Sequence, residues 1–188
     1  LVGELDLPGQ VDRSGANAVL VAPQLALDAA ESVPGKFAEP GRAAAFVDEA
    51  EGVLQRMLGG TAQAWRRAPI AIAAYSGGYR TAAQILDRGG LDARIEGLVL
   101  LDAIYGDSGI FAGWLARNHH RAFFYALHSK SSAEETEVLK TRLIERNVAY
   151  RNGDGPPAGV RFVAVETPHG EIARHGPPAE PLGAVLRR

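Results

Sequence analysis

Ser76, Asp102 and His169 are the residues of this chain whose types and order could perform nucleophilic catalysis. A serine hydroxyl attacks an acyl carbon when an adjacent imidazole takes its proton, and a carboxylate holds that imidazole in the required orientation. Each of the three residues lies at the end of an apolar run or in the loop that follows one. Their positions therefore predict a Ser-Asp-His triad at one edge of a sheet.

Ser76 lies in the stretch AYSGG, between the apolar run APIAIA and a segment with helical spacing. Small residues, Ala74 and Gly78, lie two positions before and after it. A sharp strand-to-helix turn forces the serine into a strained backbone region, and small flanking residues permit this. The N–H of Gly77, at the start of the helix, could bind a developing oxyanion. The alternative interpretation is that Ser76 only caps the helix.

The elements that must position these residues alternate along the chain. Apolar runs predict strands over 18–22, 69–75, 95–101, 122–127 and 160–165. Helical spacing predicts helices over 43–58, 77–88, 110–118 and 133–146, with a further short helix in the C-terminal tail. This alternation indicates an α/β fold, a three-layer α/β/α sandwich with a mostly parallel sheet, in which chemistry gathers at the C-terminal strand ends.

Ser131 and Ser132 precede the predicted helix 133–146, and Glu134 and Glu135 follow them three residues on. This spacing is typical of a capping box, in which the serine hydroxyl accepts from the first turn of the helix.

In this context the chain resembles the α/β-hydrolase superfamily of serine esterases and lipases. AYSGG is similar to the nucleophile elbow of that family, with Ala74 at the place of the usual first glycine, and the order serine, acid, histidine is the family order. The resemblance covers roughly Gly15 to Gly170. It implies one α/β-hydrolase-like domain over 1–188, with the N-terminal strands reduced or not included, and a triad of nucleophile Ser76, orienting acid Asp102 and general base His169.

The acid is the triad member with alternatives. Many members of the family place it after the next strand, here near 128–132, where no carboxylate occurs before Glu134. We therefore expect Asp102 to be the acid, with Asp107 and Glu134 as alternatives. The capping box already accounts for Glu134.

Further site residues are expected from position alone. Gln24 or Leu25, at the end of the predicted strand 18–22, could supply a second oxyanion N–H beside Gly77. Tyr75 and Tyr105 flank the expected site and are candidates for substrate contact, and His128 could line the pocket.

Composition limits the function. The 188 residues carry a net charge of −2 and no cysteine, so no nucleic-acid partner, disulfide or thiol chemistry is expected. We also expect no signal peptide at residue 1, no membrane span and no cofactor or metal. The compartment stays open: it is cytoplasmic or, if a signal preceded residue 1, periplasmic or secreted. The oligomeric state also stays open. The expected function is hydrolysis of a carboxylic ester, less readily an amide; the alternatives are a degenerate hydrolase-fold or a flavodoxin-like binding module.

Overall fold

The computed structural model describes residues 5–25, 33–176 and 178–187. A sheet of five parallel strands runs through its centre in the order β1-β2-β3-β5-β4. The strands are β1 (Ile70–Tyr75), β2 (Ile95–Leu101), β3 (Phe123–His128), β4 (Arg151–Asn152) and β5 (Val160–Ala164). Because all pairs are parallel, the C-terminal ends of the strands meet at one edge of the sheet.

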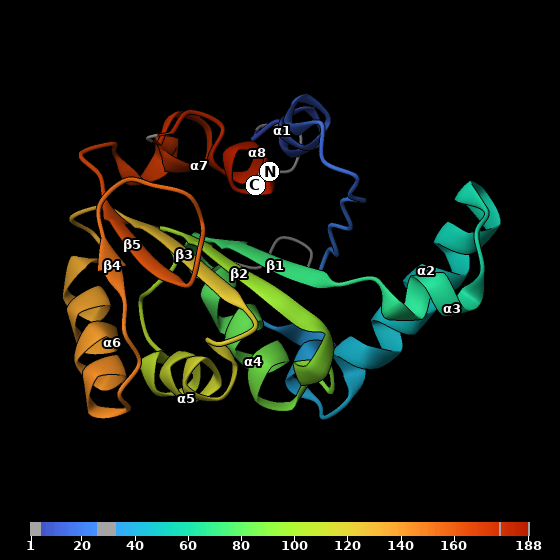
Figure 1. The fold of residues 1–188 in the computed structure, drawn as a ribbon, viewed down its shortest axis with the longest axis horizontal. Coiled ribbons are helices and arrows are strands. Elements are labelled where there is room, and N and C mark those ends of the chain that lie inside the picture. Colours follow the sequence, from blue (N-terminus) through green and yellow to red (C-terminus); the bar gives the residue numbers. More distant parts are fainter. Residues whose placement is uncertain (1–4, 26–32, 177, 188) are drawn as a thin grey trace.

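Helices cover both faces of this sheet (Figure 1). On one face lie the start of α2 (Arg42–Leu58), α4 (Tyr79–Arg88), α5 (Ser108–Asn118) and α6 (Ala133–Glu145). On the other lie α1 (Leu7–Ser14), α7 (Ile172–His175) and α8 (Pro181–Leu186). The chain is therefore an α/β sandwich with an all-parallel sheet, as the alternation of strands and helices predicts.

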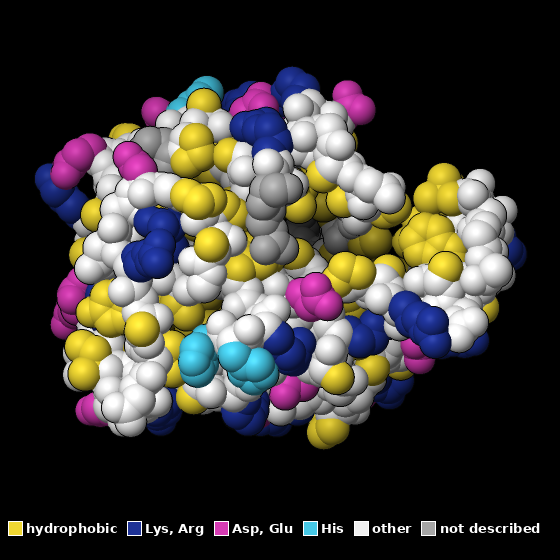
Figure 2. Space-filling model, in the orientation of Figure 1, with side chains coloured by type: hydrophobic (Ala, Val, Ile, Leu, Met, Phe, Trp, Pro, Cys, Tyr) yellow, Lys and Arg dark blue, Asp and Glu magenta, His cyan; other side chains and the backbone are white. Residues whose placement is uncertain are grey.

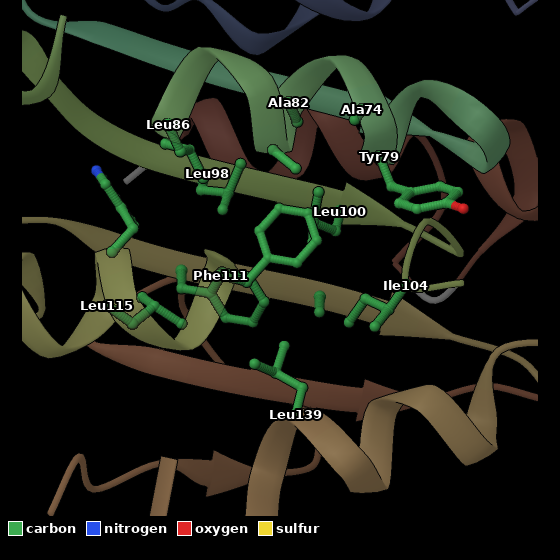
Figure 3. Packing of buried hydrophobic residues seen from close by; sticks show 14 of the residues in the cluster. Ala74, Tyr79, Ala82, Leu86, Leu98, Leu100, Ile104, Phe111, Leu115 and Leu139 are labelled. Atoms are coloured by element: carbon green, nitrogen blue, oxygen red, sulfur yellow. The ribbon is translucent and has the colours of Figure 1, made fainter. Parts of the chain in front are cut away.

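The inner strand β2, between β1 and β3, is buried from both sides because its side chains alternate between the two faces. Leu98 and Leu100 point into the layer of α4 and α5, where they share a core with Phe111 of α5 (Figure 3). Val99 and Leu101 belong to the core on the opposite face, with residues of β3, β5 and α7. A continuous apolar run is the pattern that burial on both faces requires.

Most predicted elements are confirmed, with ends that differ by one or two residues. This holds for the strands predicted at 69–75, 95–101, 122–127 and 160–165 and for the helices at 43–58, 110–118 and 133–146. The helix predicted from residue 77 begins instead with a 3₁₀ turn, Ser76–Gly78, that leads into α4. The helices α1 and α3 (Ala62–Arg67) and the short strand β4 were not predicted.

The predicted strand at 18–22 is wrong. These residues form no strand, and Val19 and Val21 are 47% and 44% exposed. An apolar β-branched run has a propensity for strand, but a strand also requires a neighbour that accepts its backbone hydrogen bonds, and this run has none in the described structure. As a result β1, which precedes Ser76, lies at the edge of the sheet.

The end of α2 and α3 project away from the body of the molecule (Figures 1 and 2). Hydrophobic side chains are exposed on this projection, among them Val53, Met57 and Leu58. Within the part of the chain described, no helix has the length and apolar character needed to cross a membrane.

Candidate active site

Ser76 directly follows β1, and its backbone has a positive φ of 53°. A non-glycine residue in this left-handed region is strained and persists only where the surrounding structure holds it there. A Cβ added to Gly78 would lie 3.5 Å from the Cβ of Ala74, so the start of the helical segment passes close over the end of the strand. The turn thus has the strained serine and the close helix–strand approach that the sequence predicts.

Asp102 occupies the equivalent place after the neighbouring strand β2, again with a positive φ, of 44°. Its N–H donates to the carbonyl of Leu127 at 2.8 Å, which extends the β2–β3 pairing by one residue and fixes the backbone there. The Asp102 side chain is fully buried.

His169 begins the 3₁₀ turn His169–Glu171 in the loop after β5 and brings the serine and the aspartate together. Its Nε2 lies 3.0 Å from the Oγ of Ser76, and its Nδ1 lies 2.7 Å from the Oδ2 of Asp102. Both distances are those of hydrogen bonds. The three residues therefore form a continuous chain from hydroxyl through imidazole to carboxylate, with the imidazole 37% exposed.

The His169 ring lies between two tyrosines. Tyr75 stacks on it with ring centroids 5.2 Å apart and also donates its hydroxyl to the backbone carbonyl of His169 at 2.8 Å. Tyr105 meets the ring edge-on at 6.0 Å, and its hydroxyl lies 3.1 Å from the imidazole Nδ1. Both tyrosines thus contact the histidine, and their expected contact with substrate stays a prediction.

The Asp102 carboxylate accepts an unusually large set of hydrogen bonds. Oδ1 accepts from the amide of Ser129 at 2.8 Å and from the hydroxyl of Ser132. Oδ2 accepts from the hydroxyls of Ser129 and Ser131, both at 2.8 Å, and of Tyr105 at 3.2 Å. Burial by itself raises the pKa of Asp102, but the bonds from Ser132, Ser129 and His169 outweigh it and hold that pKa well below its usual value. The carboxylate is therefore ionised at neutral pH.

Sequence reasoning missed the serines of this cluster and misinterpreted one of them. Ser132 is the N-cap residue of α6, yet its side chain makes no capping hydrogen bond, so the predicted capping box is wrong. The hydroxyl bonds Asp102 instead, because that carboxylate lies at the adjacent strand end. The rule that neighbouring parallel strands end at one edge could have identified these serines as partners of Asp102.

The alternative acids lie elsewhere. Asp107 is exposed at the start of α5, and Glu134 is exposed in the first turn of α6. Among the carboxylates in the described ranges, Asp102 is the one recorded in a hydrogen bond with His169. His128 is the last residue of β3 and is buried. Burial is the larger cause that lowers its pKa, and the positive charge of the nearby Lys140 lowers it further.

The expected oxyanion donors are less well defined. Gly77 lies in the 3₁₀ turn directly after Ser76, where its N–H belongs to the start of the helical segment. Gln24 is exposed and follows a run that is not a strand, so the positional reason for choosing it or Leu25 is lost. Both oxyanion assignments stay predictions.

Over residues 5–25, 33–176 and 178–187, no three His, Cys, Asp or Glu side chains come close enough together to hold a metal ion. No protein-family model, curated protein or solved structure matches the chain. Any functional assignment therefore rests on the geometry of the site itself.

Proposed function

We propose that this protein is a serine hydrolase of the α/β-hydrolase type that cleaves carboxylic esters, and amides less readily. The observation that supports this function most directly is the hydrogen-bonded chain from Ser76 Oγ to His169 Nε2 and from His169 Nδ1 to Asp102 Oδ2. Its geometry is that of a nucleophile, a general base and an orienting acid.

The ionisation of Asp102 supports the role of His169 as base. A negative carboxylate at 2.7 Å favours the imidazole tautomer with its proton on Nδ1. Nε2 then has a free lone pair that faces the Ser76 hydroxyl. As the Ser76 oxygen attacks the acyl carbon, its proton moves to Nε2, and Asp102 stabilises the imidazolium that forms.

The attack forms a tetrahedral intermediate with a negative oxygen, for which the Gly77 N–H is the proposed donor. When the intermediate collapses, the bond from the acyl carbon to the leaving oxygen breaks and His169 returns its proton to the departing alcohol. Ser76 then holds the acyl group. A water molecule repeats the attack with His169 as base, which releases the acid and restores the serine.

The strained backbone of Ser76 is a second line of support. Helix-capping residues usually adopt an extended backbone, although Asp6, Asp107 and Glu180 at other helix starts of this chain also have a positive φ. The φ of 53° at Ser76 orients the hydroxyl toward His169 at a cost of about 1–3 kcal/mol in backbone strain.

A fluorophosphonate probe tests this proposal, because it forms a covalent bond only with an activated serine. We expect wild-type protein to be labelled at Ser76 and the Ser76→Ala variant to remain unlabelled. Ser14→Ala is the matched control, because this buried serine bonds within the segment of α1 and lies outside the site. A panel of nitrophenyl esters of increasing acyl length would then define the preferred substrate.

If folded wild-type protein shows neither labelling nor ester hydrolysis, the enzymatic proposal fails. A binding module that retains the geometry of a hydrolase site would then account for the chain.

A further inference from the structure

The segment after β3, residues 129–132, contains no carboxylate, yet it supplies most of the hydrogen bonds to the triad acid. The amide of Ser129 and the hydroxyls of Ser129, Ser131 and Ser132 all donate to Asp102. Ser129 and Ser132 are 7% and 2% exposed, so two of these three serines are shielded from water. The segment therefore supplies donors to both oxygens of the Asp102 carboxylate, including Oδ2, which also bonds His169.

The place of Ser132 in the fold indicates what its hydroxyl is for. A serine at a helix N-cap ordinarily accepts from an amide of the first turn. Ser132 holds this position in α6 without making that bond, and its hydroxyl donates to Asp102 Oδ1. The helix thus lacks a side-chain cap while the carboxylate gains a donor.

The hydroxyls also lie within hydrogen-bond distance of one another, and because each has a single hydrogen, one that donates to Asp102 can only accept from its neighbours. Ser131 Oγ lies 2.8 Å from Ser129 Oγ and 2.8 Å from the Tyr105 hydroxyl, and the Ser131 amide donates to Ser129 Oγ at 3.2 Å. Each hydroxyl has one hydrogen to donate and two lone pairs that accept. The Tyr105 hydroxyl in turn lies 3.1 Å from His169 Nδ1, so the network reaches from the serine segment to the general base.

We propose that Ser131 and Ser132 are positioning residues of the triad. Ser132 holds Oδ1 of Asp102, and Ser131 holds Oδ2, the oxygen that bonds His169. This inference rests on the proposed function. It adds a fourth strand end, that of β3, to the ends of β1, β2 and β5 that carry the triad residues.

The physical reason is the freedom of a carboxylate. The terminal torsion of an aspartate side chain is broad, so burial alone does not fix which way its two oxygens point. Donors on both oxygens remove that freedom. Without the hydroxyl of Ser132, the Ser129 amide is the one donor left to Oδ1 in the described part of the chain. Without the hydroxyl of Ser131, Oδ2 loses the donor nearest to Tyr105. The imidazole is then less firmly held toward Ser76.

Alanine variants test the inference. Ser131→Ala and Ser132→Ala should each lower kcat for a nitrophenyl ester about 10-fold, with KM changed less than about twofold, because orientation matters in the transition state more than in substrate binding. Ser131→Thr keeps a hydroxyl and should restore most of the lost kcat. Ser14→Ala should behave as wild type.

A second measurement does not depend on turnover. The Nδ1 proton of His169, shared with Asp102, should give a downfield NMR signal that is absent in Asp102→Asn and weakened by exchange with water in both alanine variants. Ser131→Thr should restore it. Because Ser131 is exposed, we expect Ser131→Ala to fold. If Ser132→Ala does not fold, the Ser131→Ala variant alone tests the positioning role.

The outcomes separate the two proposals. If wild type hydrolyses esters but Ser131→Ala retains full kcat and an unchanged Nδ1 signal, the positioning role is overturned and the hydrolase stands. If wild type hydrolyses no ester but the Nδ1 signal depends on the serines, the positioning role holds and the proposed function fails.

Discussion

Ser76 and Asp102 have positive φ values at the same position, one residue beyond the end of adjacent strands. A left-handed residue there ends the extended backbone abruptly, so its side chain no longer follows the alternation of the strand. Both residues turn to the same imidazole as a result. At the scale of single residues the site therefore depends on two strained backbone positions as much as on the three side chains.

The identity of the acid gives the first prediction. Asp102→Asn should lower kcat for ester hydrolysis about 10³- to 10⁴-fold, because an amide cannot hold the imidazole in the tautomer that accepts the serine proton. Steady-state kinetics on a nitrophenyl ester would measure the loss. The exposed carboxylates supply the controls: Asp107→Asn and Glu134→Gln should stay close to wild type. If Glu134→Gln lost kcat while Asp102→Asn kept it, the assignment of Asp102 as the acid would be wrong.

The second prediction concerns the pH dependence of stability. The pKa of Asp102 is lowered in the folded protein from an ordinary value of 3.8, so its ionised form stabilises the fold at pH values above that ordinary value. This contribution is lost as the pH falls below 3.8 toward the folded pKa. The free energy of unfolding of wild type should therefore exceed that of Asp102→Asn at neutral pH, and the gap should narrow in acid.

Urea denaturation of both proteins at about pH 7 and about pH 3 would test this linkage. A gap of equal size at the two pH values would contradict it.

At the scale of elements, Tyr75 connects two strands that are not neighbours. It is the last residue of β1, and its hydroxyl donates to the backbone carbonyl of His169, in the loop after β5. The strands β2 and β3 lie between them in the sheet. The stacked ring and this hydrogen bond together hold the loop that carries His169 over Ser76 at the end of β1.

The third prediction follows from this link. Tyr75→Phe keeps the stacked ring but removes the hydrogen bond, so kcat should fall about 3- to 10-fold while the fold is retained. Hydrogen exchange at the amides of residues 169–172 should become faster than in wild type, which mass spectrometry can measure. Tyr150→Phe, next to β4 at the other edge of the sheet, is the matched control. Unchanged exchange in Tyr75→Phe would argue against the link.

At the scale of the whole molecule, the site requires that the sheet keep its strands in register, because its residues come from the ends of three strands. Gly97 of β2 stands opposite Phe123 of β3 in that register. A Cβ on Gly97 would lie 2.1 Å from the Phe123 ring. The ring is 4% exposed and belongs to the core on the face of α7, so it has little room to move.

The fourth prediction tests this packing. Gly97→Ala should destabilise the fold by about 1–3 kcal/mol, because the added methyl group forces the Phe123 ring out of its place. Gly109→Ala is a control in α5, where nothing lies within 4 Å of the added Cβ, and it should stabilise the helix by about 0.5–1 kcal/mol. Thermal and urea unfolding would measure both. Equal stabilities of the two variants would contradict the packing argument.

The sequence by itself predicted most of the elements and singled out Ser76, Asp102 and His169, whose side chains the structure brings into hydrogen-bond distance. Continuous apolar runs predict buried parallel strands, and the polar residue at the end of such a run lies at the edge where the strand ends meet, as Ser76 and Asp102 do. These inferences succeed because they depend on local patterns. The run at 18–22 has the same local pattern and forms no strand, because pairing depends on a neighbour that no local pattern reveals.

The tertiary structure alone decided which groups surround His169 and Asp102. It places Tyr75 and Tyr105 on either side of His169, and it directs the Ser132 hydroxyl to Asp102 rather than to the helix that Ser132 begins. A hydroxyl can bond a helix amide or a nearby carboxylate, and local sequence is compatible with both. The choice depends on which polar group the fold brings within about 3 Å, and that distance is set by the pairing of β2 with β3.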